Sequence, residues 1–335
     1  MEIASSKLGT YFVRWKLPKN IEMVNLNACS IKDLTPIGKL QKLKSFKASK
    51  SYKYGYTDKF ETLVLVDSVT ALEIEGFHLY KDEMYFPPNL QILSMPFIDI
   101  FDLKSLEIPK SVTKLGLKSS FVPFAQSDVS TTDPQIDLSN FEKLSSLELI
   151  HSKLTSCNSL VSARFLSSIR LILCTSLEDL RGIESLKILS SLYVIHCGGA
   201  SSVPLHRTFF CNTKFPENLR DLVFVPNSSA LASTSRDFLR SPEDYELVNE
   251  EPHLKVGKRF QLPKGLTDLS LEGPHLVIDD DLELPRTLQM PTFKDIGAAN
   301  CLCNIANLSS LHTLSIHNAR IETLDNSLLF QIEIG

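Results

Sequence analysis

Large apolar residues recur along the chain in one short pattern, apolar-x-x-apolar-x-apolar. The first copy is Ile21, Val24 and Leu26, and the last is Leu311, Leu314 and Ile316. Two apolar residues that flank one polar residue are typical of a strand with one buried face. The other copies begin at Leu43, Val69, Leu90, Val112, Leu144, Leu166, Leu189, Leu219, Leu266 and Leu288. The pattern therefore predicts twelve short strands.

The copies follow one another at nearly constant intervals. The first apolar residues of successive copies are 22, 26, 21, 22, 32, 22, 23, 30, 47, 22 and 23 residues apart. We number the first apolar residue of a copy position 1, so that the other two occupy positions 4 and 6. One unit of this length cannot bury its apolar residues alone, whereas stacked units share one continuous core. The spacing therefore predicts a solenoid.

Two further positions fit the same frame. Position 11 is apolar in seven copies, and position 9 is Cys, Ser or Asn in seven. The residues are Ile31, Leu79, Ile100, Val122, Leu154, Leu276 and Ile321 at position 11, and Cys29, Ser51, Ser120, Ser152, Cys174, Cys197 and Asn227 at position 9. Over roughly residues 17–321 the chain thus resembles leucine-rich repeat proteins. The resemblance implies an α/β solenoid, a horseshoe of about twelve repeats with parallel strands on the concave face and an irregular or short helical convex side.

Two kinds of repeat alternate. One carries a proline ahead of the strand, as in Ile108-Pro-Lys-Ser-Val-Thr-Lys-Leu-Gly-Leu117. It resembles FNIP-type repeats, without their Phe-Asn pair, and the L-P-x-x-L-x-x-L repeats of bacterial leucine-rich effectors. The other kind, at residues 31–43 and 177–186, resembles repeats of intracellular phosphatase-regulatory and F-box-associated leucine-rich proteins. These patterns leave the subfamily open.

We expect a single domain over residues 1–335, with insertions at 122–138, 198–214 and 227–260, where the intervals lengthen. Such insertions usually project from one face of a solenoid. Near the end, Leu329, Ile332 and Ile334 spell a further strand that stops at Gly335. Because terminal repeats normally carry polar caps, we hypothesise that the chain is truncated at its C-terminus or is capped by a partner.

Composition excludes several classes of protein. The net charge is −4 and 22% of residues are charged, so there is no overall electrostatic case for binding nucleic acid or an anionic membrane. No stretch has the roughly 18 apolar residues of a membrane helix. Residues 1–10 lack the pattern of a signal peptide, and the seven cysteines suggest no disulfide framework. We therefore expect a cytoplasmic or nuclear protein that is not secreted.

The chain offers little material for catalysis. Neither G-x-x-x-x-G-K nor G-x-G-x-x-G occurs, and no second cysteine pair accompanies Cys301-x-Cys303. Cys174 and Cys197 occupy the structural position 9 of the repeat, and 279–281 reads as an acidic turn. We expect no catalytic residue, no cofactor, no metal and no small-molecule substrate, and hence a protein that is not an enzyme.

The residues at positions 3, 5 and 7 should line the concave face. In copies six to nine, position 7 is Ile150, Ile172, Ile195 or Val225, which predicts an apolar ridge. The neighbouring column at position 5 holds Glu148, Arg170, Tyr193 and Val223, followed by Ser146, Ser168, Ser191 and Asp221 at position 3. Elsewhere these columns are polar or charged, with Asn25, Asn27, Lys47, Glu73, Glu75, Lys114, Lys118 and Glu272. A contiguous apolar patch rimmed by charge is typical of a partner site. Two alternatives remain open: β-branched residues are simply favoured in strands, or the insertion at 227–260 folds over the ridge.

These features predict a scaffold that binds a partner protein on its concave face, with Arg170 and Tyr193 as anchors. Two narrower roles remain open. One is the substrate-recognition part of an F-box ubiquitin-ligase adaptor whose F-box lies outside this chain. The other is a regulatory subunit of the phosphatase type. In either role the partner is another protein, and we expect neither nucleic acid nor membrane.

Overall fold

The computed structural model describes residues 2–4, 17–27, 35–49, 65–75, 85–97, 107–119, 138–198, 213–226, 254–258, 260–273, 276–279, 281–299, 305 and 307–319. The chain divides into two compact units, Met1–His151 and Ser152–Gly335. Each unit is described by itself below as unit 1 and unit 2. The prediction of a single domain over 1–335 stays a prediction.

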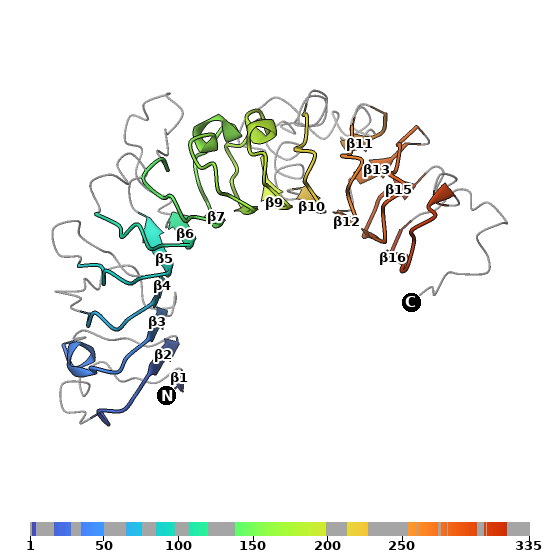
Figure 1. Ribbon diagram of the computed structural model, residues 1–335. Helices are drawn as coiled ribbons and strands as arrows, with labels where there is room; N and C mark the ends of the chain where they lie inside the picture. The colour runs from blue at the N-terminus through green and yellow to red at the C-terminus, as the bar shows by residue number, and fades with distance from the viewer. Residues whose placement is uncertain are drawn as a thin grey trace, which may run out of the picture. The chain divides into compact units, whose positions relative to one another are not determined.

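Unit 1 is a parallel sheet in which each strand pairs with the next along the chain (Figure 1). Its strands are β1 (Glu2–Ala4), β2 (Met23–Asn27), β3 (Ser45–Ser49), β4 (Ala71–Glu75), β5 (Ile92–Phe97), β6 (Lys114–Ser119) and β7 (Ser146–Ile150). β2 to β7 coincide with the first six copies of the repeat. β1 was not predicted, and it pairs in parallel with β2 through residues 2–4.

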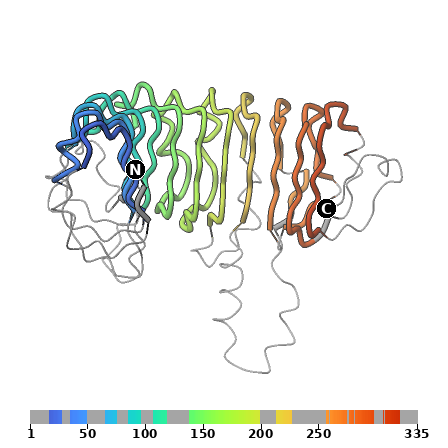
Figure 2. The backbone as a smooth tube through the Cα atoms, turned by 90° about the horizontal axis from the view of Figure 1, so that it is seen from below, coloured from blue at the N-terminus to red at the C-terminus, as the bar shows by residue number. Residues whose placement is uncertain are grey.

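Unit 2 repeats the arrangement with the last six copies. Its strands are β8 (Ser168–Ile172), β9 (Ser191–Cys197), β10 (Asp221–Pro226), β12 (Asp268–Glu272), β14 (Met290–Lys294) and β16 (Ser315–His317). Figure 2 shows the successive coils of this unit running side by side. All twelve predicted strands therefore form, and the leucine-rich repeat solenoid is confirmed in each unit.

Corresponding positions of neighbouring repeats pair in register, whatever the interval between them. Position 4 runs from Ile169 through Leu192 and Leu222 to Leu269, across intervals of 23, 30 and 47 residues. The degraded copy follows the same register, because Pro291 pairs with Leu269 and is buried. The insertions therefore leave the stacking of the strands intact.

Backbone hydrogen bonds at position 2 join each repeat to the one before it. The carbonyl oxygen of Ser167 accepts the N–H groups of Ser190 and Ser191, at 2.8 and 3.0 Å. The same two-donor arrangement recurs at the carbonyls of Glu22, Lys44, Thr70, Gln91 and Thr113 in unit 1, and of Ser190, Arg220, Thr267 and Gln289 in unit 2. Because buried backbone groups need partners, this ladder fixes the start of β3 to β7 in unit 1 and of β9, β10, β12, β14 and β16 in unit 2.

The core consists of positions 1, 4 and 6, as predicted. These residues are buried in every copy from Leu43 to Phe293, and only Ile21 and Leu311 at the two end copies are half-buried at position 1. Burying one leucine, isoleucine or phenylalanine side chain stabilises a fold by about 1.5–3 kcal/mol. The repeats therefore stack mainly because their leucines leave water together.

A tight turn leads into each strand. The N–H at position 1 donates to the carbonyl three residues earlier, as from Leu90 to Pro87 at 3.1 Å. Prolines begin six of these turns, namely Pro18, Pro87, Pro109, Pro216, Pro263 and Pro285. The prolines noticed in the sequence thus mark turns that repeats without proline also make, such as the turn from Leu40 to Leu43 at 2.9 Å.

The side opposite the strands, the turn side, is built in two ways. Single turns of 3-10 helix, η2 (Ile37–Lys39), η6 (Cys157–Leu160) and η7 (Ile183–Ser185), match the expected short helical segments. In the later repeats of unit 2 the turn side instead carries a second parallel sheet, visible above β12 in Figure 1. It consists of β11 (Leu254–Val256), β13 (Leu276–Ile278) and β15 (Ala298–Ala299). The prediction of an irregular or short helical turn side was therefore wrong for these repeats, because their short apolar segments pair with one another as strands.

The residue directly after the strand, at position 8, has a left-handed backbone in many repeats. Such φ values occur at His151 (56°), Leu173 (54°), His196 (52°), Asp295 (53°) and Asn318 (49°). Gly273, at the same position, has a φ of 142°. This sharp change of direction carries the chain out of the sheet and toward position 9.

Several predicted features lie outside the described residues. They include nearly all of the insertions at 122–138, 198–214 and 227–260, and the proposed terminal strand at 329–334. Among the residues that the structure describes, no helix is long and apolar enough to span a membrane.

Candidate functional site

The strand face of unit 2 carries a short apolar ridge. Position 7 of β8 pairs in register with position 7 of β9, so that Ile172 lies beside Ile195, and Ile195 in turn lies beside Val225 of β10. All three side chains are half-buried, in contrast to the fully buried residues at positions 4 and 6. Neighbouring parallel strands lie about 4.8 Å apart, so these branched side chains form one continuous surface.

A cation and an aromatic ring lie together beside the ridge, at position 5. The guanidinium carbon of Arg170 lies 5.3 Å from the centroid of the Tyr193 ring, within the range of a cation–π contact. Tyr193 also pairs in register with Val223 of β10. The stack holds the aromatic ring in one orientation, and preorganised aromatic and Arg side chains are the usual anchors of an interface.

The column at position 3 is polar. The Ser191 hydroxyl donates to the Asp221 carboxylate at 2.7 Å, across the β9–β10 pair. Across β8, β9 and β10, polarity therefore changes from hydroxyl and carboxylate groups at position 3 to apolar side chains at position 7. Four residues separate these columns, which is about 13 Å along a strand.

Two residues of the predicted site, Glu148 and Ile150, belong to unit 1. Both are half-buried at the outward positions of β7. The predicted set of eight therefore divides into these two and the six residues of unit 2, which are Arg170, Ile172, Tyr193, Ile195, Val223 and Val225.

The strand face of unit 1 differs in being built from charges that neutralise one another. The Lys47 ammonium lies 2.7 Å from the Glu73 carboxylate of the next strand, and Lys118 pairs with Glu75. Ion pairs of this kind, between partly exposed side chains, add little to stability. They leave this face polar, as the sequence predicted.

His151, at position 8 of unit 1, faces the same group of charges. Burial lowers the pKa of His151, and the positive charge of Lys118 lowers it further. The imidazole is therefore uncharged at neutral pH. His151 thus belongs to the turn that follows β7, and its side chain adds no positive charge to the strand face of unit 1.

The position-9 cysteines are structural, in line with the sequence interpretation. Cys174 and Cys197 are both buried free thiols. The Cys197 thiol donates to the Leu171 carbonyl of the preceding repeat at 3.3 Å, and Gly198 donates its N–H to the Cys174 carbonyl at 2.9 Å. A hydrogen bond with Cys174, together with burial, raises the pKa of Cys197. A protonated, buried thiol is a poor nucleophile.

Other groups singled out in the sequence show turn chemistry. Asp281 of the acidic turn accepts the N–H of Lys258, 23 residues before it, at 2.9 Å and so links two turn-side segments. His312 lies 2.7 Å from the Ser310 carbonyl, and Cys301 and Cys303 lie outside the described residues. Within the described part of the chain, no three His, Cys, Asp or Glu side chains are placed to hold a metal ion.

One feature of this face was missed in the sequence. Asp221 of β10 pairs in register with Asp268 of β12, although 47 residues separate them along the chain. Met290, next in the same column, is 49% exposed. Both lie at position 3 of the repeat frame, so extending the columns past the longest insertion would have found them.

No protein-family model matches the chain, and no curated protein matches it by sequence. Among solved structures, an internalin (InlF) from Listeria monocytogenes matches 99% of this chain and 84% of its own, with 17% identity and a TM-score of 0.42. The leucine-rich repeat domain of APL1B matches 93% of this chain and 76% of its own, with 15% identity and a TM-score of 0.41. In a complex of TLR13 with ssRNA13, 49% of the matched chain aligns with 93% of this one, with 14% identity and a TM-score of 0.48. The fold assignment rests on the repeat register described above.

Proposed function

We propose that the chain is a scaffold that binds another protein through the strand face of unit 2. The observation that carries the proposal is the ridge of Ile172, Ile195 and Val225, half-buried and in register beside the Arg170–Tyr193 stack. Apolar side chains on a sheet face that are left partly in water gain free energy when a partner covers them. The charged strand face of unit 1 lacks such a ridge among its described residues.

We also propose that the protein is not an enzyme and that it acts in the cytoplasm or nucleus. Buried free thiols at Cys157, Cys174 and Cys197 fit a reducing compartment. Nothing among the described residues favours an F-box adaptor over a phosphatase-type subunit, so the proposal stops at protein binding. Exclusion of nucleic acid rests on the overall charge of the sequence alone.

The test is affinity capture from native lysate with a ridge variant. Ile195→Thr combined with Val225→Thr keeps β-branched residues in the strands but removes apolar surface. Phe165→Ser combined with Ile188→Ser is the matched control, because these side chains are 53% and 46% exposed ahead of the strands, away from the ridge.

We expect the ridge variant to lose a defined partner that the control retains, with unchanged circular dichroism in both. Loss of that partner only in the control would move the site to the turn side. Partners that survive both variants would contradict binding through the ridge.

A further inference from the structure

Two carboxylates lie side by side on the strand face of unit 2, and no described residue supplies a counter-charge to them. Asp221 and Asp268 are partner residues of β10 and β12, at position 3 in both strands, and both are half-buried. Like charges directly opposite one another destabilise a sheet. The two neighbouring carboxylates therefore destabilise the protein when no ligand is bound.

The nearest cation along the chain is occupied elsewhere. Arg220 precedes Asp221, but its guanidinium donates to the carbonyls of Glu217 and Gly265, at 3.2 and 3.0 Å. The carboxylates accept hydroxyl hydrogens instead, from Ser191 to Asp221 at 2.7 Å and from Thr267 to Asp268 at 2.6 Å. These bonds hold the charges in place and do not neutralise them.

The other cations of this strand face have partners of their own. Arg170 stacks on Tyr193, and Lys294 lies 3.7 Å from the Glu272 carboxylate. Among the residues that the structure describes, no lysine, arginine or histidine forms an ion pair with Asp221 or Asp268. A charge that is fixed, partly desolvated and uncompensated favours a cationic ligand.

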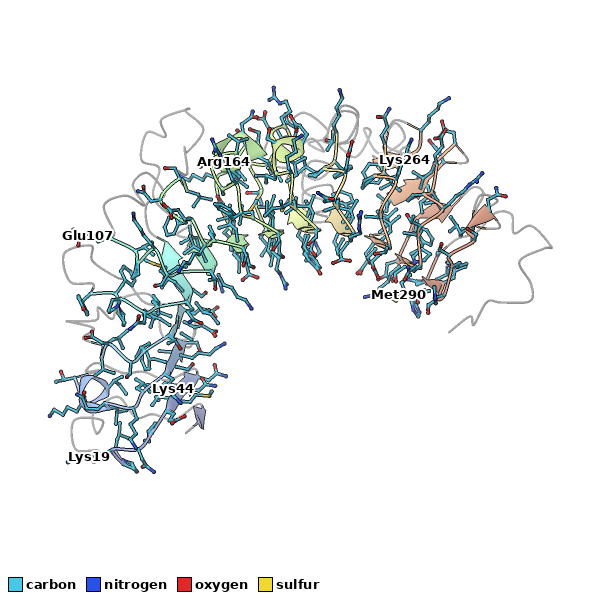
Figure 3. All side chains as sticks on the ribbon, in the orientation of Figure 1. Lys19, Lys44, Glu107, Arg164, Lys264 and Met290 are labelled. Carbon is cyan, nitrogen blue, oxygen red and sulfur yellow. The ribbon has the colours of Figure 1, made fainter. Side chains whose placement is uncertain are left out.

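Apolar side chains border the two carboxylates, and they indicate which kind of cationic ligand the site can bind. Val223 lies two residues after Asp221 on the same face, and Met290 lies beside Asp268 in register. Met290 is 49% exposed on the strand side of unit 2, opposite Lys264 (Figure 3). A lysine or arginine side chain combines an apolar stem with a charged head, and it fits a carboxylate pair flanked by apolar groups better than a hydrated metal ion does.

We propose that this face selects a protein segment that presents lysine or arginine next to an apolar residue. The charged head lies between Asp221 and Asp268, its stem lies over Val223 and Met290, and the apolar residue covers the ridge at Ile195 and Val225. The proposal rests on the proposed function and adds the chemistry of the partner to it.

The binding test uses two fluorescent peptides, one of alternating lysine and leucine and one of alternating glutamate and leucine. Anisotropy is measured with the wild type, with Asp221→Asn/Asp268→Asn, and with Asp279→Asn. The last variant is the control for loss of a carboxylate elsewhere, because it removes one negative charge directly after β13 on the turn side. Because Asp221→Asn/Asp268→Asn removes both carboxylate charges from the contact, it should weaken binding of the lysine peptide about tenfold or more.

We expect that loss only in the double variant, and weaker binding of the glutamate peptide to the wild type. Equal binding of the two peptides, an equal loss in Asp279→Asn, or no binding of the lysine peptide would overturn the proposal. If Ile195→Thr/Val225→Thr weakens binding and Asp221→Asn/Asp268→Asn does not, the ridge stands and the charge selection fails. The opposite pattern would retain the charge selection and reject the ridge.

A measurement without peptide tests the premise of repulsion. At low ionic strength the melting temperature of Asp221→Asn/Asp268→Asn should exceed that of the wild type, and added salt should narrow the difference, because screening weakens repulsion. A wild type that melts no lower than the double variant would contradict the premise.

Discussion

Position 8 shows how one residue sets the path of each repeat. His, Asp, Asn and Gly occupy the left-handed backbone there at His196, Asp295, Asn318 and Gly273, and these residue types tolerate that conformation best. Leu173 is the exception, with a φ of 54°. It holds the position because its N–H donates to the Ile195 carbonyl of the next repeat at 2.8 Å. The surrounding hydrogen bonds thus impose a conformation that leucine disfavours.

Leu173→Asn should therefore raise the free energy of unfolding by about 0.5–1 kcal/mol, because asparagine relieves the left-handed strain. Chemical denaturation measures the change. Ile188→Asn is the control, since Ile188 is a branched residue that is 46% exposed and lacks a positive φ, whereas Leu173 is half-buried. A loss of stability in Leu173→Asn would mean that packing of the leucine side chain outweighs the strain.

The thiols at position 9 give a second prediction for single residues. Cys174 and Cys197 are 0% and 5% exposed, and burial and hydrogen bonding raise the pKa of Cys197. Iodoacetamide at mild alkaline pH should leave both unmodified in the folded protein and alkylate both in denaturant, because burial keeps the reagent from both thiols and the raised pKa of Cys197 also keeps that thiol protonated. Mass spectrometry of the digested protein gives the extent of labelling. Rapid labelling of Cys197 before unfolding would contradict its structural role.

For the elements, the sequence predicted the strands of the repeats well and the turn side poorly. Twelve strands could be predicted because positions 4 and 6 alternate with outward residues, as at Leu192 and Val194. β11, β13 and β15 could not, because a run such as Leu276–Ile278 is buried on both sides and carries no alternation. β1 escaped notice since residues 2–4 lack the pattern of the repeat.

The candidate site was predictable to the same extent. A period of two residues places Ile172, Tyr193 and Ile195 on the outward face as soon as the strands are assigned. The alignment of Asp221 with Asp268 depends on a register that survives a 47-residue interval. The repeat frame places both aspartates at position 3, but the sequence alone does not show that the strands on either side of the insertion pair with each other. That pairing comes from hydrogen bonds to the Arg220 carbonyl, which the structure reveals.

A glycine controls the contact between two turn-side elements of unit 2. Gly182, which caps η7, has a φ of 96°, and a Cβ atom there would lie 2.7 Å from the backbone of Asn158 in η6. Gly182→Ala should destabilise the protein by about 1–3 kcal/mol, through both backbone strain and this clash. Gly116→Ala is the control, because its Cβ would meet the movable hydroxyl of Ser94 at 3.0 Å. Similar midpoints of urea unfolding for the two variants would refute the role of the close contact.

On the scale of the whole molecule, stability passes from each repeat only to its neighbours. Within unit 2, β9 pairs with β8 and β10, and no described residue of β9 pairs with β14 or β16. In such a linear array, stability is close to a sum of repeat energies and nearest-neighbour contacts. Local damage should therefore stay local.

Leu192→Ala should test this, since Leu192 is fully buried at the centre of β9. The cavity should cost about 2–5 kcal/mol. Hydrogen exchange should accelerate at amides of β8, β9 and β10 more than at those of β14 and β16. Uniform acceleration across the unit would show that it opens as one cooperative body.

The two-donor ladder at position 2 also bears on how such a chain can change its length. Each repeat carries the carbonyl that its successor needs and the pair of N–H groups that its predecessor expects, as Ser167 and Ser190 do. A segment such as 266–287 therefore carries both halves of the joint, because the N–H groups of Thr267 and Asp268 donate to the Arg220 carbonyl and the Thr267 carbonyl accepts from the repeat that follows. If this segment were duplicated in tandem, the N–H groups of the copy would donate to the position-2 carbonyl of the repeat before it. The position-2 carbonyl of the copy would accept from the repeat after it, and the other strands would keep their hydrogen bonds. Because the same hydrogen bonds join successive repeats whatever their sequence, whole repeats can be added to or removed from the solenoid.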